Sequence, residues 1–380
     1  MDFSIPESVK GFLNSVKVFV DKHIEPIAEE IDQKDAIPQS LICKMGQMGL
    51  FALRIPKEYA GLGLTVLESC IITEEIAKAG LAFVRLIGGG DLDISEFGTK
   101  EQKEKYLPKL ATGNLIGATT MTESEAGSDA GNIKTTGIEI NNKFVLNGTK
   151  IMIQRADIAG LFSVTAVTNP EAISKGKISR FLVERDSKGL NIGKPDLKMG
   201  LNGIHTCQVI LSDCEVPRNN ILGELGEGLS GMLKTLNIGR LRIIGAAAIG
   251  NAQKILELSI SQAKNRIQFR KPIASYQAIQ WMLADMATYI HGSRMMMYHA
   301  ASLADQGVDI RREASMVKLF ASEMACQVAD MALQIFGGMG YMKSCPVERY
   351  FRDNRVGRIM DGTSEIQRIV IARELLKSVS

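Results

Sequence analysis

The feature that most constrains this chain is a change of side-chain periodicity that occurs twice along its 380 residues. Residues 1–115 repeat apolar side chains at spacings of three and four, which predicts helices. Residues 116–225 instead consist of short apolar runs between glycine, proline and aspartate, which predicts strands. The helical spacing returns over residues 226–380. The pattern therefore predicts an α+β fold with a helical, a β and a second helical domain.

The strands of the middle part can be placed individually. Gly137–Gly148 alternates polar and apolar residues around an Asn-Asn pair, as a β-hairpin does. Leu161–Val167, Arg180–Glu184 and Gln208–Leu211 are further short strands. Because no internal repeat or low-complexity linker separates the three parts, we expect them to pack as one unit.

The composition excludes several classes of partner and site. The formal net charge is only +3 and Lys and Arg form no run, so a nucleic-acid partner is not expected. No segment approaches the roughly 20 consecutive apolar residues of a membrane span, and the first residues lack the pattern of a signal peptide. The 6 cysteines form no CxxC pair and the 4 histidines show no ligand spacing, which predicts a reduced, cytoplasmic chain without a metal.

Three segments combine residue types that suit a phosphate-bearing or heteroaromatic ligand. Thr119–Asp129 offers hydroxyl and backbone N–H donors in an extended segment followed by a turn, although a plain polar loop has the same composition. Arg266 precedes a proline-marked turn, where its guanidinium either binds paired phosphate oxygens or solvates a helix end. Gln334–Tyr341 is rich in glycine but follows a predicted helix rather than a strand, which argues against a dinucleotide fold.

Together with Ile359–Arg368, which contains the sequence Asp-Gly-Thr-Ser, these segments follow the order found in the acyl-CoA dehydrogenase family. The chain resembles that family over essentially its whole length. The resemblance implies an FAD enzyme with an N-terminal helical domain (1–115), a middle β-barrel-like domain (116–225) and a C-terminal four-helix bundle (226–380). It also implies a homotetramer that oxidises acyl-CoA thioesters and passes electrons to electron-transferring flavoprotein or a similar acceptor.

The resemblance also assigns residues to the cofactor and to the thioester. Residues around Gln334 are expected to reach the FAD of a neighbouring subunit, and Arg240 and Arg373 either contact CoA or are surface arginines of helices. The residues implied at FAD are Thr119, Met121, Thr122, Ser128, Met152, Gln154, Arg266, Gln268, Phe269, Gln277, Gln334, Gly337, Gly338, Thr363 and Glu365. Those implied at the acyl-CoA are Asp91, Ser128, Asn237, Arg240, Asp361 and Arg373.

By position, Asp361 is the base that removes the α-proton of the substrate while FAD accepts a hydride from the β-carbon. The family commonly has glutamate here, and aspartate sets the carboxylate back by about 1.5 Å. An α-branched or ring substrate needs that room. Within the family, an aspartate at this position resembles the alicyclic branch, which acts on cyclohexane- and cyclohex-1-ene-1-carboxyl-CoA.

Asp91 is the second candidate catalytic carboxylate. It follows three glycines and precedes a predicted helix, so it is either a helix N-cap or a charge in the acyl pocket. If the ring already has a double bond at Cα, Asp361 has no α-proton to take, and a more distant ring proton must leave in a 1,4 sense. Asp91 is then the expected base, with Asp93 as the less favoured alternative. The predicted reaction is oxidation of cyclohex-1-ene-1-carboxyl-CoA to the 1,5-diene, or of cyclohexanecarboxyl-CoA to the 1-ene.

Three other functions compete with this one. The first is α,β-dehydrogenation of a short- or branched-chain acyl-CoA with the aspartate acting alone. The second is a catalytically silent paralogue that only binds acyl-CoA or flavin. The third is an acyl-CoA oxidase, which the chain length and the lack of a Ser-Lys-Leu ending disfavour.

Overall fold

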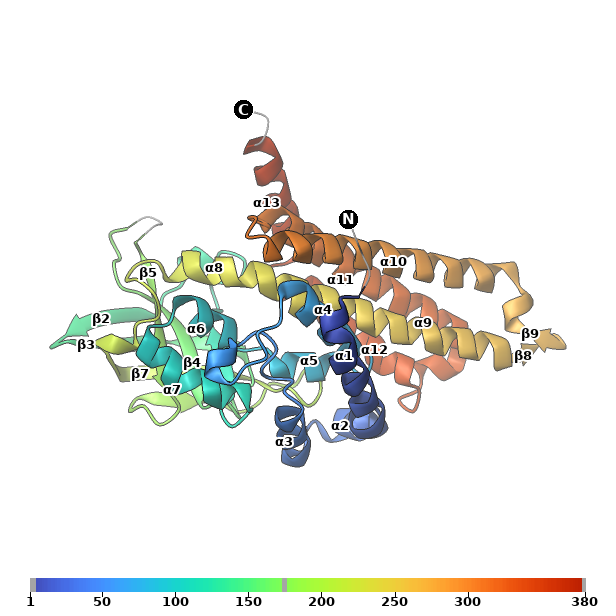
Figure 1. Cartoon of the computed structure of the whole chain (residues 1–380), viewed down its shortest axis with the longest axis horizontal. Coiled ribbons are helices and arrows are strands. Elements are labelled where there is room, and N and C mark those ends of the chain that lie inside the picture. Colours follow the sequence, from blue (N-terminus) through green and yellow to red (C-terminus); the bar gives the residue numbers. More distant parts are fainter. Residues whose placement is uncertain (1–4, 173–175, 378–380) are drawn as a thin grey trace.

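The computed structural model describes residues 5–172 and 176–377, and its first domain is helical (Figure 1). Capping boxes fix where two of its helices begin: Thr65 exchanges hydrogen bonds with Glu68, and Thr99 does so with Gln102. The helices of this domain are α1 (Glu7–Phe19), α2 (Ala28–Lys34), α3 (Gln39–Gln47), α4 (Val66–Ala77), α5 (Leu81–Ile87), α6 (Asp91–Phe97) and α7 (Lys100–Ala111).

Within the described residues, the middle domain forms a seven-stranded sheet in the order β1-β4-β2-β3-β7-β6, with β5 paired to β4. The hairpin predicted from the alternating pattern is confirmed. Its turn residues Asn141 and Asn142 have φ values of 49° and 61°, which a two-residue hairpin turn requires and asparagine tolerates. The strands are β1 (Gly117–Thr120), β2 (Thr136–Ile140), β3 (Lys143–Gln154), β4 (Leu161–Val167), β5 (Ile178–Glu184), β6 (Leu190–Ile192) and β7 (Thr206–Pro217).

The C-terminal domain consists of long helices that run side by side (Figure 1). α8 continues through a π-helical segment, Arg240–Ala246, directly into α9. A small hairpin, β8–β9, joins α9 to α10, and both Phe269 and Arg270 in its turn have positive φ. The elements are α8 (Gly228–Gly239), α9 (Ala247–Asn265), β8 (Ile267–Gln268), β9 (Lys271–Pro272), α10 (Gln277–Asp305), α11 (Arg311–Phe336), α12 (Pro346–Arg355) and α13 (Ser364–Lys377).

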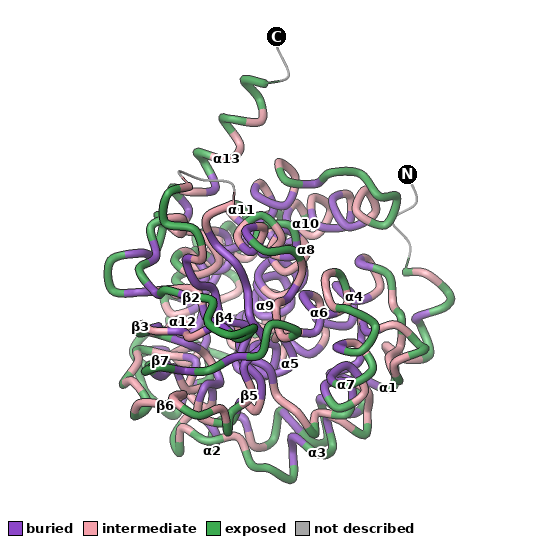
Figure 2. The backbone as a smooth tube through the Cα atoms, turned by 90° about the vertical axis from the view of Figure 1, so that its left-hand side faces the viewer, coloured by how far each residue is buried: buried purple, intermediate pink, exposed green. Residues whose placement is uncertain are grey.

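The three domains share their cores, as expected from the lack of linkers. α4 packs against α1 and also against α9 and α10, so Val66 and Cys70 belong to the C-terminal core. Leu201 and Ile204 of the middle domain pack into the N-terminal core. Figure 2 shows buried backbone gathered around α5 and α9, whereas α13 extends away from the body. The junction of the three domains therefore lies inside the molecule, close to α5.

Candidate active site

Asp361 lies in a short loop before α13 and has a left-handed backbone, with φ at 55°. Gly362 follows with φ at 91°. Buried Gln367 donates its side-chain amide to the carbonyl of Gly362 at 2.9 Å, and Arg240 donates Nε to the carbonyl of Asp361 at 3.2 Å. Aspartate tolerates this conformation better than most residues. Because two donors from other elements hold the loop, its unusual geometry is typical of a functional site.

The carboxylate of Asp361 is paired with an arginine that the sequence patterns did not single out. Arg85 of α5 donates from a terminal guanidinium nitrogen to Oδ2 of Asp361 at 3.1 Å, and from Nε to the side-chain oxygen of Gln154 at 2.8 Å. The only sequence signal for it was a single arginine among the apolar residues of Leu81–Ile87, all of which are buried. The structure thus brings together Asp361 and Gln154, which were predicted, with Arg85, which was not.

A second buried arginine fixes the backbone of the first. Arg155 donates to the carbonyl of Arg85 and, at 3.1 Å, to that of Gly117. Burial lowers the pKa of Arg155 to about 9, and the neighbouring charge of Arg85 adds to this effect, while Asp91 and Asp361 oppose it. Arg155 is therefore surrounded by both candidate catalytic carboxylates and by the arginine that pairs with one of them.

β3 is irregular where the sequence places the flavin. Its pairing with β7 shifts register between Lys150 and Ile153, which marks a β-bulge. Met152 lies in this bulge with φ at 55°, and its side chain is 58 % exposed. Bulges occur next to active sites, where they re-aim side chains, and this one leaves the apolar side chain of Met152 exposed two residues before Gln154.

The segment before the bulge is held by a buried ion pair. Lys150 is fully buried, and its ammonium group lies 2.7 Å from the carboxylate of Glu123 and 3.1 Å from the hydroxyl of Thr165. Burial lowers the pKa of Lys150 to about 8, against the raising effect of Glu123. Thr122 accepts a hydrogen bond from the N–H of Ile151 at 2.9 Å. The predicted cofactor segment is thus tied to β3 next to Met152 and Gln154.

Lys318 is another charged residue that sequence reasoning missed. It lies on α11, is fully buried, and its ammonium group has no hydrogen-bond partner within the described residues. Burial lowers its pKa to about 8, and the charge of Asp361 opposes this most strongly. Lys318 is therefore a buried positive charge that interacts electrostatically with Asp361.

An apolar hollow adjoins Arg85, the ion-pair partner of Asp361. Leu81 and Arg85 of α5 line the hollow, and Met360, the residue before Asp361, lines it as well. Its other walls come from the π-helical segment, α9, α11 and the chain before Asp361. The lining residues are Leu81, Arg85, Ile243, Ile244, Ala247, Ala248, Ser322, Ala325, Asn354, Gly357 and Met360.

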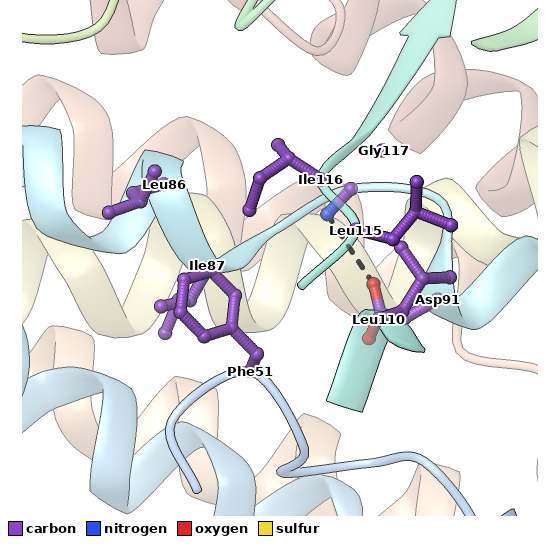
Figure 3. A pocket seen from close by; sticks show the side chains of 9 residues that line it. Phe51, Leu86, Ile87, Asp91, Leu110, Leu115, Ile116 and Gly117 are labelled. Atoms are coloured by element: carbon purple, nitrogen blue, oxygen red, sulfur yellow. Dashed lines mark hydrogen bonds between the residues drawn. The ribbon is translucent and has the colours of Figure 1, made fainter. Parts of the chain in front are cut away.

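A second hollow lies beside Asp91 (Figure 3). Asp91 is 5 % exposed; Oδ1 accepts the N–H of Gly89 at 3.4 Å, and Oδ2 lies 3.6 Å from Arg242 without a hydrogen-bond partner in the described parts of the chain. The N-cap reading is wrong, because Gly90 occupies the cap and Asp91 is the first residue of α6. The residues around this hollow are Phe51, Leu86, Ile87, Gly89, Asp91, Leu110, Leu115, Ile116 and Gly117.

Asp91 thus lines one hollow, whereas the other is lined by Arg85, the partner of Asp361, and by Met360. Leu81 and Arg85 of α5 line the first hollow, and Leu86 and Ile87 line the second. The sequence had placed both carboxylates in one pocket. Asp93, the less favoured alternative, accepts hydrogen bonds at Oδ1 from Arg180 and from Thr235, each at 2.6 Å. Asp93 is therefore a structural residue.

Other predicted residues lie near Asp361 or on the surface around it. Asn237 accepts a hydrogen bond from Arg240 at 2.9 Å, and Thr363 accepts the N–H of Ile366 at 3.3 Å. Arg240 donates hydrogen bonds to the Asn237 side chain and to the Asp361 carbonyl, and its contact with CoA stays a prediction. Thr119 and Met121 are partly buried at the end of β1, whereas Ser128, Glu365 and Arg373 are exposed.

The remaining predicted cofactor residues lie far from Asp361, toward the other end of the long helices (Figure 1). Gln334 is sixteen residues beyond Lys318 on α11, which corresponds to about 24 Å along the helix. Within one chain, the structure does not bring these residues to Asp361. All of them are exposed: Arg266, Gln268, Phe269, Gln277, Gln334, Gly337 and Gly338.

Family models for the N-terminal, middle and C-terminal domains of acyl-CoA dehydrogenase match residues 6–114, 118–214 and 226–376. The chain belongs to the acyl-CoA dehydrogenase family. It is an FAD-dependent oxidoreductase that acts on acyl-CoA, and both the predicted fold and the predicted cofactor are confirmed.

Relatives of this acyl-CoA dehydrogenase act in both directions. This chain is 43 % identical over 384 residues to an acryloyl-CoA reductase (NADH) of Anaerotignum propionicum, and the match covers 99 % of this chain and 96 % of the relative. The CarC subunit of the caffeyl-CoA reductase-Etf complex of Acetobacterium woodii is 41 % identical to this chain, and the match covers 94 % of this chain and 96 % of CarC. The human mitochondrial short-chain specific acyl-CoA dehydrogenase is 39 % identical to this chain, and the match covers 98 % of this chain and 91 % of the human protein.

Solved structures agree with this assignment. Butyryl-CoA dehydrogenase from Megasphaera elsdenii superposes with a TM-score of 0.95 at 33 % identity, covering 99 % of this chain and 100 % of that one. An acyl-CoA dehydrogenase from Bacillus anthracis complexed with FAD gives a TM-score of 0.92 at 32 % identity, and the match covers 99 % of this chain and 68 % of that one.

Two negative findings apply to residues 5–172 and 176–377. No group of three or more His, Cys, Asp or Glu side chains could hold a metal ion there. None of the helices in these ranges is long and apolar enough to cross a membrane.

Proposed function

We propose that this acyl-CoA dehydrogenase oxidises an alicyclic acyl-CoA, with cyclohex-1-ene-1-carboxyl-CoA going to the cyclic 1,5-diene or cyclohexanecarboxyl-CoA to the 1-ene. The observation that carries the proposal is the short carboxylate of Asp361, whose partner Arg85 and preceding residue Met360 line an apolar hollow. A ring attached at Cα is bulkier than a linear chain at that atom. The shorter base and the apolar walls of Ile243 and Ile244 suit such a group.

FAD, when bound, supplies the hydride acceptor of the reaction. Met152 and Gln154 would face its ring system, and Thr119, Met121 and Thr122 would border it. The exposed apolar side chain at the bulge of β3 supports this placement, since a soluble surface gains nothing from an exposed methionine in a strained conformation.

For a saturated ring, Asp361 takes the proton from Cα. Developing negative charge on the thioester oxygen needs donors already in place, and the loop around Gly362 is held rigidly enough to provide a backbone donor.

For the 1-ene, the two hydrogens leave from the allylic ring carbons C3 and C6, one as a proton and one as a hydride. Asp91 would take the proton. Its Oδ2 is buried without a hydrogen-bond partner among the described residues, which is costly unless the group has a use. Because Asp91 lines the hollow beside Gly89 and Asp361 does not, this step requires the ring to extend toward Gly89.

Assembly and electron transfer complete the proposal. The exposed cofactor residues around Gln334 lie about 24 Å along α11 from Lys318, so they would serve the FAD of a second copy in a homotetramer. The CarC relative forms part of an Etf complex, which supports electron-transferring flavoprotein or a similar protein as the acceptor. We also propose a cytoplasmic location, because the 6 cysteines are free.

The second candidate is α,β-dehydrogenation of a short- or branched-chain acyl-CoA, with Asp361 acting alone. The short-chain specific human relative and the butyryl-CoA dehydrogenase structure support it. The acryloyl-CoA and caffeyl-CoA reductases among the relatives support net flux in the reducing direction. A third candidate is a silent paralogue that binds acyl-CoA without oxidising it.

An anaerobic substrate panel tests these functions. The FAD-loaded protein would be mixed with butyryl-, isobutyryl-, cyclohexanecarboxyl- and cyclohex-1-ene-1-carboxyl-CoA, and flavin bleaching would be followed by absorbance. The proposal expects the fastest bleaching with a ring thioester. Faster bleaching with butyryl-CoA would favour the second candidate, and binding without bleaching by any thioester would favour the third.

A further inference from the structure

Arg85 occupies a position that the proposed chemistry leaves unexplained. Its side chain is only 11 % exposed, and it lies on α5 among buried apolar residues. A buried guanidinium is costly unless it is paired and hydrogen-bonded. The contacts that offset this cost therefore indicate what Arg85 does.

These contacts join all three domains at one point. Arg85 belongs to the N-terminal domain, Gln154 ends the strand β3 of the middle domain, and Asp361 belongs to the C-terminal loop. The two hydrogen bonds, at 2.8 and 3.1 Å, come from one planar guanidinium. A planar fork fixes the directions of both partners together, which a lysine ammonium does not do.

The backbone of Arg85 is fixed independently of its side chain. Arg155 donates to the carbonyl of Arg85 and to the carbonyl of Gly117 in β1. Arg240 holds the main chain of Asp361 through a hydrogen bond to its carbonyl. Among residues 5–172 and 176–377, Arg85 alone contacts the carboxylate of Asp361 through a hydrogen bond or ion pair, so this contact sets the direction of the carboxylate.

We propose that Arg85 is a positioning residue that holds the carboxylate of Asp361 in register with Gln154. The proposal rests on the proposed function in taking Asp361 as the base. An aspartate carboxylate is set back from the glutamate position by about 1.5 Å. Arg85 fixes that shorter side chain relative to the strand that presents Met152 and Gln154. A displacement on the order of 1 Å costs about a hundredfold in rate, so losing this contact affects the chemical step more than binding.

The test compares Arg85→Ala and Arg85→Lys with a matched control, Arg352→Ala, in the full-length FAD-loaded protein. Arg352 has a side chain 10 % exposed and also bridges three domains, through Asp32, Glu348 and the carbonyl of Met199. It lies outside the site. Hydrogen–deuterium exchange of the peptide covering residues 359–367 reports on the loop without any substrate. Anaerobic flavin reduction by cyclohexanecarboxyl-CoA and butyryl-CoA, with thioester affinity measured separately, reports on the chemistry.

We expect Arg85→Ala to speed exchange in residues 359–367 and to lower the rate constant of flavin reduction about a hundredfold, with thioester affinity changed little. Added guanidinium ion should restore part of that rate, and Arg85→Lys should restore less. Arg352→Ala should lower the melting temperature without either effect. If Arg85→Ala does not fold, Arg85→Gln takes its place in every comparison.

Unchanged loop exchange in Arg85→Ala, or the same losses in Arg352→Ala, would overturn the positioning role. These results are distinct from failure of the proposed function. If neither thioester reduces the wild-type flavin, the proposed function fails, and loop exchange alone decides the role of Arg85.

Discussion

Replacing Asp361 by glutamate tests the link between the short base and a ring substrate. The added methylene advances the carboxylate by about 1.5 Å, toward the space that a ring at Cα would fill. A misplacement on the order of 1 Å costs about a hundredfold, or roughly 2.7 kcal/mol of activation free energy. The left-handed backbone at φ 55° adds strain, because a longer side chain tolerates this region less well than aspartate.

We therefore expect Asp361→Glu to slow flavin reduction by cyclohexanecarboxyl-CoA about a hundredfold and to speed reduction by butyryl-CoA, whose α-carbon is less crowded. The assay is stopped-flow absorbance of the flavin under anaerobic conditions, with both thioesters at saturation. Asp361→Asn is the matched control and should lose activity toward both. Equal rates for wild type and Asp361→Glu with the ring thioester would refute the reasoning from side-chain length.

Three further predictions concern residues around the site. Asp91→Asn should abolish flavin reduction by cyclohex-1-ene-1-carboxyl-CoA while FAD absorbance is retained. Gly362→Ala should slow flavin reduction at least tenfold and destabilise the loop by about 1–2 kcal/mol, because its Cβ would meet the Gln367 amide at 2.5 Å with φ at 91°. Burial lowers the pKa of His205, but Asp157, 2.6 Å away, outweighs it and raises that pKa above its ordinary value. The stability from this pair is therefore full below the ordinary pKa and is lost as pH rises through the folded pKa, which urea unfolding from pH 5.5 to 9 would show.

Each of these three predictions has a control variant or an outcome that would contradict it. Undiminished turnover in Asp91→Asn would remove this residue from the mechanism. Gly11→Ala has open space around its new Cβ and should leave the rate unchanged; an equal loss there would mean that any added methyl perturbs the protein. The pH-dependent part of the stability should disappear in His205→Gln and persist in His291→Gln, whose side chain is exposed.

The sequence predicted the features that depend on neighbouring residues. The Asn141–Asn142 turn and the order of the domains follow from local periodicity and turn residues, and both are observed. Asp361 and Gln154 could both be found because the segments that contain them resemble the family pattern.

Contacts between distant residues escaped prediction for a physical reason. Arg85 and Asp361 are 276 residues apart, and nothing in an apolar helix shows what its one arginine faces. Asp91 looked like a helix cap because three glycines precede it, but the last of them, Gly90, takes the cap. Lys318 is hidden in the same way, since helical spacing places it on the inner face of α11 without naming its neighbours.

The most direct test of the proposed reaction is a single turnover of cyclohex-1-ene-1-carboxyl-CoA deuterated at C3 and C6. The FAD-loaded protein would be mixed with the thioester without oxygen, and the product ring would be examined by mass spectrometry and NMR. Our account predicts a bleached flavin and a 1,5-diene that has lost one deuterium from each of the two labelled carbons. An oxidised flavin and intact label, with butyryl-CoA bleaching the same preparation, would contradict it.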